Sequence, residues 1–166
     1  MWKKVYDYFQ KYPAQQRVVE MLLAYGLRVD GKKIFCGKIE LSDSKIARAA
    51  GVDRRAVVST IETINKNKWL RKIFSTLQPT CHLKESAPQM NWGVIEIITV
   101  DASMPGILSS VASIIAKAKM SMRQAIVDDY QLAEEPKLFI VTEKPLPSNL
   151  LSKLRKAKGV KGVVTY

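Results

Sequence analysis

Apolar positions in the first part of the chain recur at helical spacing. Three stretches show this pattern, at residues 2–12, 13–25 and 68–77, and each predicts an amphipathic helix. Pro13 suits the first turn of the second stretch, and Gly26 is a residue type that commonly ends a helix. The first part of the chain is therefore predicted to be mainly helical.

A β-hairpin is predicted over Val29–Leu41, between the second and third of these stretches. Asp30-Gly31 is a strong turn dipeptide, and apolar residues flank it on both sides. The hairpin could act as a wing beside a neighbouring pair of helices. Its three lysines could contact phosphates or could be ordinary surface lysines: Lys32, Lys33 and Lys38.

The pattern changes after residue 92, where strand-like and helical segments alternate. The predicted elements are strands at 93–100, 120–129, 136–144 and 160–166, and helices at 105–119 and 148–158. This β-α-β-β-α-β order is typical of a ferredoxin-like plait, a four-stranded antiparallel sheet with helices on one face. The predicted fold class is α+β. Its second strand lies at a sheet edge, which favours pairing with a second copy.

The two patterns meet in an irregular polar stretch that contains Pro79 and Pro88. Such a stretch is typical of a domain boundary. We predict a first domain at residues 1–78, a linker at 79–91 and a second domain at 92–166.

Charge separates the same two parts. The chain has 27 Lys and Arg against 15 Asp and Glu, a formal net charge of +12. Residues 1–90 hold 17 of these basic side chains and eight of the acidic ones, whereas residues 91–166 hold ten and seven. A basic half beside a nearly neutral half favours a polyanionic partner for the first half only. The alternative is a charge that serves solubility alone.

Ser42–Ile64 predicts two short helices joined by a sharp turn. Ser42 and Asp53 are favourable N-caps, and Gly51 can adopt the left-handed conformation that such a turn needs. The first helix places Ile46, Ala47 and Ala50 inward, and the second places Val57, Ile61 and Ile64 inward. Its predicted outward residues are Arg54, Arg55, Ser59, Glu62 and Thr63.

The stretch IARAAGVDRRAVVSTI resembles the helix-turn-helix pattern of bacterial and archaeal proteins, with Ala47, Gly51, Val52 and Val57 in register. The resemblance implies that the second helix enters the major groove of DNA from its N-terminal turns. The predicted DNA-binding residues are Ser44, Lys45, Arg54, Arg55, Ser59 and Thr63. A helical corner used only for packing is the alternative.

Residues 93–166 resemble an ACT domain, whose hallmark is a strand, a loop ending in Pro-Gly and a helix opening with an aliphatic pair. The matching residues are Val100, Pro105, Gly106, Ile107 and Leu108. Ser103 stands where the family often has Asp or Asn, and the acid lies earlier, at Asp101.

This resemblance implies an amino acid bound between that loop and the second strand of a partner subunit. A helix N-terminus suits the carboxylate of such a ligand. The predicted ligand-binding residues are Ser103, Met104, Pro105, Gly106, Ile107, Leu108 and Gln124, with Asp128 as a further polar contact. A helix start that binds nothing is the alternative.

The sequence gives little support for metal binding, catalysis or membrane insertion. Cys36, Cys81 and His82 are too few for a four-ligand zinc site, and we expect two reduced, buried thiols. No catalytic motif is present, so no enzyme activity, cofactor or metal is predicted. No apolar run is long enough for a membrane span and the N-terminus lacks a signal-peptide pattern, which favours a cytoplasmic protein.

These observations together predict a ligand-responsive transcription regulator. Its predicted partners are duplex DNA, an amino acid as effector and a second copy bound through the ACT domain. The combination resembles prokaryotic regulators of amino acid metabolism, with archaeal members the most similar. The alternative is an amino-acid-sensing or dimerising adaptor that binds protein or RNA.

Overall fold

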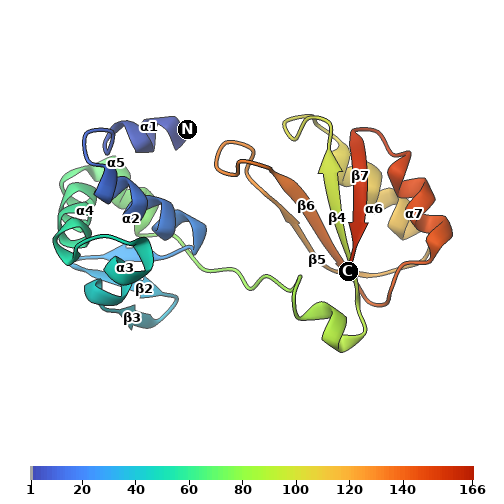
Figure 1. The fold of residues 1–166 in the computed structure, drawn as a ribbon, viewed down its shortest axis with the longest axis horizontal. Helices are drawn as coiled ribbons and strands as arrows, with labels where there is room; N and C mark the ends of the chain where they lie inside the picture. Colours follow the sequence, from blue (N-terminus) through green and yellow to red (C-terminus); the bar gives the residue numbers. More distant parts are fainter. Residues whose placement is uncertain (1) are drawn as a thin grey trace. The chain divides into compact units, whose positions relative to one another are not determined.

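The computed structural model describes residues 2–166, which divide into two compact units. The first unit extends through Cys81, and the second is His82–Tyr166. Figure 1 shows a mainly helical first unit with a small sheet and a second unit built on a larger sheet. The mixed α+β class predicted from the sequence is confirmed.

Five helices and three short strands form the first unit. In chain order they are α1 (Trp2–Asp7), α2 (Pro13–Ala24), β1 (Arg28–Asp30), β2 (Lys33–Cys36), β3 (Ile39–Leu41), α3 (Asp43–Ala50), α4 (Arg54–Lys66) and α5 (Lys68–Phe74). Helix α2 packs against α3 and α4, and α5 contacts α4 and β1. Fully buried side chains at their centre include Leu22, Ile34, Ile64, Leu70 and Phe74.

The first helix is shorter than predicted. α1 ends at Asp7, and the chain continues in turns such as the one in which the Phe9 N–H donates to the Tyr6 carbonyl. These turns bury Phe9 but leave Tyr12 exposed. Helical spacing alone predicted one continuous helix, yet Pro13 disfavours helical geometry at the residue before it.

The predicted hairpin is a three-stranded antiparallel sheet of order β1-β2-β3. The first turn lies at Gly31 and the second at Gly37, with φ of 55° and 60°. The sequence interpretation recognised only the first turn. Val29 pairs with Ile34, and both side chains are buried against the helices.

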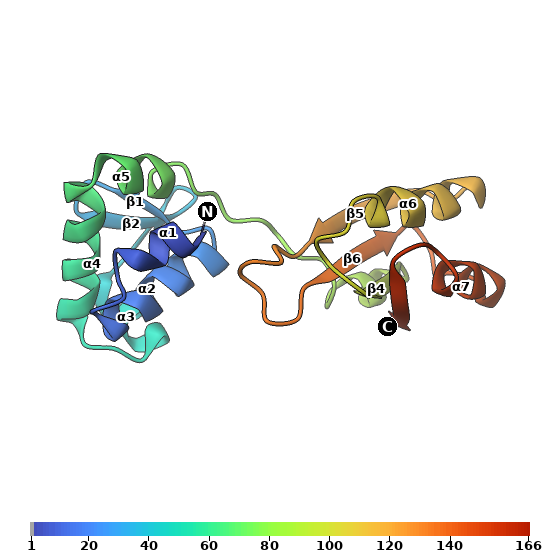
Figure 2. The same ribbon diagram turned by 90° about the horizontal axis from the view of Figure 1, so that it is seen from above.

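The second unit follows the predicted β-α-β-β-α-β order. Its elements are a 3₁₀ helix η1 (Ala87–Met90), β4 (Gly93–Thr99), α6 (Ile107–Lys117), β5 (Met122–Val127), β6 (Lys137–Thr142), α7 (Ser148–Arg155) and β7 (Val160–Thr165). The sheet order is β5-β6-β4-β7, with every neighbouring pair antiparallel. Strand β5 lies at an edge, as predicted, and α6 and α7 lie on one side of the sheet (Figures 1 and 2).

The opposite face of this sheet is covered by residues 82–92, which we call the strap. Ile95 and Ile140 point toward the helices, so the adjacent Val94 and Val141 point away from them. Ala87 of the strap is completely buried against these two valines. Residues 82–91, which we predicted as linker, therefore pack within the second unit.

Within residues 2–166 the longest helix, α4, has 13 residues. None of the helices described is both long and apolar enough to cross a bilayer.

Candidate nucleic-acid and small-molecule sites

The helix-turn-helix candidate has the local geometry that its sequence predicts. The Ser42 hydroxyl accepts a hydrogen bond from the Lys45 N–H at 3.4 Å, and the Asp53 carboxylate accepts one from the Arg55 N–H at 2.8 Å. Gly51 closes the turn with a φ of 62°, and nothing lies within 4 Å of where its Cβ would be. A glycine therefore suits this turn because of its positive φ, and not because a side chain would lack space.

Helix α4 has one buried and one exposed face. The buried face consists of Val57, Thr60, Ile61 and Ile64, with the Thr60 hydroxyl donating to the Ala56 carbonyl. The exposed face contains Arg54, Arg55, Val58, Glu62 and Lys66. The side chain of Arg55 is 92% exposed and that of Arg54 is 67% exposed. Both arginines are thus accessible at the first turn of α4.

Two predicted positions of this surface differ from expectation. Ser59 is half-buried, and Thr63 donates to the Ser59 carbonyl and to the Gln15 side chain of α2. Thr63 therefore faces a neighbouring helix and not outward, which corrects our prediction. The sequence interpretation omitted Val58, whose exposed position on α4 follows from the same helical spacing.

The small sheet and the start of α3 enclose a groove of about 320 Å³. Its lining includes Lys32, Lys33, Ser44 and Arg54, so it unites hairpin lysines with two predicted DNA-binding residues. Lys33 pairs with Glu40 at 2.7 Å, and Arg54 pairs with Asp43 at 3.6 Å. The Lys33–Glu40 pair is exposed and contributes little stability, so an entering phosphate could replace Glu40 at low cost, whereas Asp43 is partly buried. Lys45 is exposed nearby but does not line the groove.

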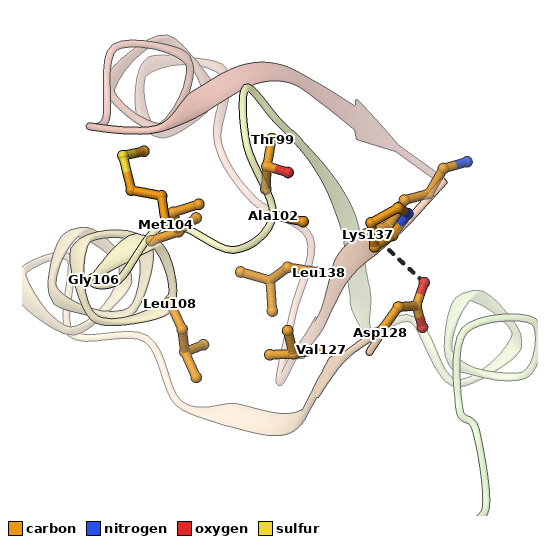
Figure 3. Close-up of a pocket in the computed structure, with 11 residues that line it drawn as sticks. Thr99, Ala102, Met104, Gly106, Leu108, Val127, Asp128, Lys137 and Leu138 are labelled. Atoms are coloured by element: carbon orange, nitrogen blue, oxygen red, sulfur yellow. Dashed lines mark hydrogen bonds between the residues drawn. The ribbon is translucent and has the colours of Figure 1, made fainter. Parts of the chain in front are cut away.

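A cavity of about 140 Å³ lies in the second unit where the loop after β4 meets α6 and the ends of β5 and β6 (Figure 3). Leu108, Val127 and Leu138 give it apolar walls, and Thr99 and Asp128 add polar groups. The full lining is Thr99, Ala102, Met104, Gly106, Ile107, Leu108, Val127, Asp128, Pro136, Lys137 and Leu138.

Four of the predicted ligand-binding residues line this cavity: Met104, Gly106, Ile107 and Leu108. Ser103 and Pro105 belong to the same loop but do not line it. The Asp101 carboxylate accepts hydrogen bonds from the Ser103 hydroxyl at 2.7 Å and from its N–H at 2.8 Å, which lower the pKa of Asp101. Asp101 thus shapes the loop through Ser103.

Gln124 lies elsewhere. Its side-chain oxygen accepts a hydrogen bond from the Leu83 N–H of the strap at 2.9 Å, and its strand partner is Val141 on the strap side of the sheet. Alternation along β5 therefore directs Gln124 to the strap side of the sheet, whereas the cavity lies on the helix side. The contact between Gln124 and a ligand of a partner subunit stays a prediction. Asp128, beyond the end of β5, lines the cavity instead, and its carboxylate accepts from the Lys137 N–H at 3.1 Å (Figure 3).

The strap side of the sheet holds a charged cluster that the sequence did not reveal. The Glu96 side chain is only 4% exposed and accepts from Lys137 at 2.8 Å, from Tyr166 at 2.7 Å and from Lys84 at 3.3 Å. Burial by itself would raise the pKa of Glu96, but these three donors outweigh it and lower the pKa to about 2. Glu96 is therefore ionised and fully paired at neutral pH.

The cysteines do not both occupy the buried positions that we expected. Cys36 is half-buried on β2, and Cys81 is exposed. Residues 2–166 contain no group of three or more His, Cys, Asp or Glu side chains arranged to hold a metal ion.

Comparisons with known proteins give only distant structural likeness. No protein-family model and no curated protein matches the chain. Two solved structures from Mycobacterium tuberculosis share 16% identity: its leucine response regulatory protein (TM-score 0.30, 92% of this chain and 88% of that one) and a feast or famine regulatory protein complexed with L-methionine (TM-score 0.31, 93% and 90%). The C-terminal domain of the MgtC protein from the same organism is 12% identical, with a TM-score of 0.33 over 45% of this chain and 83% of that one. At such scores and identities the likeness supports no conclusion about this chain.

Proposed function

We propose that this protein is a ligand-responsive transcription regulator of amino acid metabolism. In this proposal residues 1–78 bind duplex DNA through α3 and α4, and residues 92–166 form an ACT-type domain that binds an amino acid. The observation that carries the proposal is the exposed first turn of α4, where Arg54 and Arg55 follow a capped turn at Gly51 in the basic part of the chain. Arginines at this point of a helix-turn-helix suit base edges and phosphates.

The groove beside α3 adds a second set of DNA contacts to the proposal. Lys32, Lys33, Ser44 and Arg54 converge there, as a phosphate-binding surface next to a reading helix would require. Arg55 lies at the same end of α4 and is the candidate for base contact, with Val58 available for the methyl group of thymine.

Selection of bound genomic DNA by the full-length protein, followed by salt titration on the selected duplex, tests DNA reading. Affinity should fall steeply with salt, because each phosphate contact releases counterions. Arg54→Ala and Arg55→Ala should each cost about 1–3 kcal/mol of binding if they read bases. Lys158→Ala is the control, since Lys158 is an exposed lysine of the second unit. Unchanged binding by both arginine variants, with no sequence preference, would favour an adaptor that binds protein or RNA.

The cavity is the proposed effector site. It combines apolar walls with the N-terminus of α6, whose first N–H groups suit a carboxylate. A thermal-shift screen of the twenty amino acids tests it, since a ligand at 100 times its dissociation constant adds about 2.7 kcal/mol of stability. Leu108→Trp should fill the cavity and abolish the shift. Leu132→Trp, the same change at an equally exposed leucine outside the lining, should retain it.

The size of the cavity supports a homodimer in which a second copy completes the site. Its volume of about 140 Å³ is below the roughly 300–1,000 Å³ of ordinary ligand pockets. Strand β5 pairs with β6 on one side only, and Met122 on this strand is exposed. Sedimentation of the wild type and of a Met122→Lys, Ala125→Lys variant tests pairing through β5. Equal molar masses for the two proteins would contradict it.

A further inference from the structure

One ion pair joins the strap to the sheet, and its carboxylate, Glu96, also pairs with a lysine of the sheet. Lys84 of the strap contacts one oxygen of Glu96, and Lys137 of β6 contacts the other at 2.8 Å. Other strap contacts include a hydrogen bond from the Leu83 N–H to Gln124, the packing of Ala87, and Arg123 stacked 4.8 Å from the Trp92 ring. The Lys84 ammonium also lies 4.3 Å from the centre of the Tyr166 ring and 5.0 Å from that of Phe139, whose ring His82 contacts as well. Lys84 also lies 3.9 Å from the exposed Glu85 of the strap, but its buried counter-ion, Glu96, is shared with Lys137.

Lys137 also borders a groove on the surface of the second unit. The groove has a volume of about 460 Å³, with Ile98, Val100 and Pro136 as apolar lining and Lys137 and Lys161 as its basic groups. One carboxylate already lies there: Glu135, 86% exposed, is 4.0 Å from the Lys137 ammonium. That distance is the limit of an ion pair, so a ligand carboxylate could replace Glu135 at little cost. Figure 3 shows the Lys137 side chain extending away from the smaller cavity.

We propose that this groove binds a small apolar carboxylate at Lys137 and Lys161, and that the strap responds to its occupancy through the shared Glu96. Lys84 and Lys137 repel each other across one carboxylate. An anion beside Lys137 offsets that repulsion and draws Lys137 away from Glu96, so Glu96 holds Lys84 more firmly. The sign of the coupling follows: the occupied groove tightens the strap.

This coupling would act on the connection between the two units. The strap begins at residue 82, directly after the first unit ends at Cys81. A released strap would lengthen the free chain between the units, and a tightened strap would shorten it. The regulatory meaning rests on the proposed function, but the coupling itself can be measured on the full-length protein without DNA.

Amide hydrogen exchange over the strap is the test, because the Ala87 and Trp92 N–H groups are bonded within it. Glu96→Gln should speed exchange there by about tenfold or more, because it removes the counter-ion of Lys84. Lys137→Met should slow it by up to about tenfold, because it removes a competitor for Glu96. A purely structural role for the network would make both variants speed exchange. Exchange in β4 and β6 reports whether the sheet is intact, and Lys158→Met is the control.

Ligand coupling is tested with isobutyrate as probe and isobutyramide as its neutral match. Isobutyrate should slow strap exchange in the wild type, and Lys137→Met with Lys161→Met should abolish that effect. Equal effects of the acid and the amide, faster exchange with the acid, or faster exchange in Lys137→Met would each overturn the proposal. Failure of DNA binding, or an amino acid shift that Leu108→Trp leaves unchanged, would instead contradict the proposed function, because DNA binding is assigned to α3 and α4 and Leu108 lines only the smaller cavity.

Discussion

Three helices of the first unit begin in a different way from the two helices of the second unit. In the first unit α3, α4 and α5 start at side-chain caps, with Ser42, Asp53 and Asn67 each accepting backbone N–H groups of the first turn. In the second unit α6 follows Gly106 and α7 follows Pro147, and neither has a side-chain cap. The helices α3–α5 are thus delimited by residues within a few positions, whereas α6 and α7 depend more on packing against the sheet.

Polar interactions differ in the same way. The first unit carries its candidate chemistry on exposed side chains at one end of α4, positioned by a cap and a turn beside them. The second unit holds Glu96 through partners 12, 41 and 70 residues away, at Lys84, Lys137 and Tyr166. A surface built from local signals can be altered with little loss of stability, whereas a change in the Glu96 network should destabilise the second unit.

Gly26→Ala should cause the largest loss of stability. At Gly26 the backbone of the first unit packs closely against backbone that lies far away in the sequence. Gly26 has a φ of 60°, and an added Cβ would collide with the Gln78 carbonyl. We expect a loss of about 3–4 kcal/mol in the free energy of unfolding of this unit. Gly37→Ala has the same φ in open space and should cost only about 1 kcal/mol. Denaturant unfolding measures both, and equal losses would contradict the steric argument.

Acid should weaken the second unit through Glu96. The pKa of Glu96 is lowered from 4.5 to about 2 in the folded protein, so its stabilising contribution is complete above pH 4.5. That contribution should be lost as the pH falls toward 2, at a cost of about 2 kcal/mol after allowance for the partly exposed lysines. Urea unfolding between pH 5 and pH 2 should show this loss in the wild type and in Glu85→Gln, which alters an exposed carboxylate. A Glu96→Gln variant with the same acid dependence would contradict the assignment.

A matched pair of cap variants tests the difference in helix starts. Asn67 accepts the N–H groups of Trp69 and Leu70, so Asn67→Ala should cost the first unit about 1–2 kcal/mol. Ser148→Ala at the first position of α7 removes no cap and should change stability by less than about 0.5 kcal/mol. Thermal unfolding of both variants is sufficient, and equal losses would remove the distinction.

Arg55→Ala should give the smallest effect on stability, within about 0.5 kcal/mol of wild type, because its side chain is almost fully exposed. The same variant is expected to lose DNA affinity. A large loss of stability would show that Arg55 is structural and would weaken the proposed reading surface.

Much of the architecture could be predicted because its signals are local. Ser42, Gly51 and Asp53 mark the helix pair in sequence, and the structure gives each the predicted conformation or hydrogen bond. The order of strands and helices after residue 92 could equally be predicted from the spacing of apolar residues. The turn at Gly37 was missed because its strands are only three and four residues long, too short for alternation to be recognised.

The contacts of individual side chains were predicted less well. Thr63 shares helical spacing with outward residues, but the nearby α2 provides Gln15 as its partner. Gln124 was assigned to the small-molecule site from its strand alone, and the strap determines that it contacts Leu83. Neither partner can be inferred from the neighbouring residues in the sequence.

The sequence by itself determined the order of most helices and strands and the caps and turn of α3 and α4, because caps, turns and apolar periodicity act over a few residues. Only the tertiary structure determined that residues 82–92 cover the sheet and that Glu96, Lys84, Lys137 and Tyr166 form one charged cluster. The physical reason is that a buried charge needs several partners within about 3 Å. Those partners come from segments far apart in the chain, which only the folded sheet brings together.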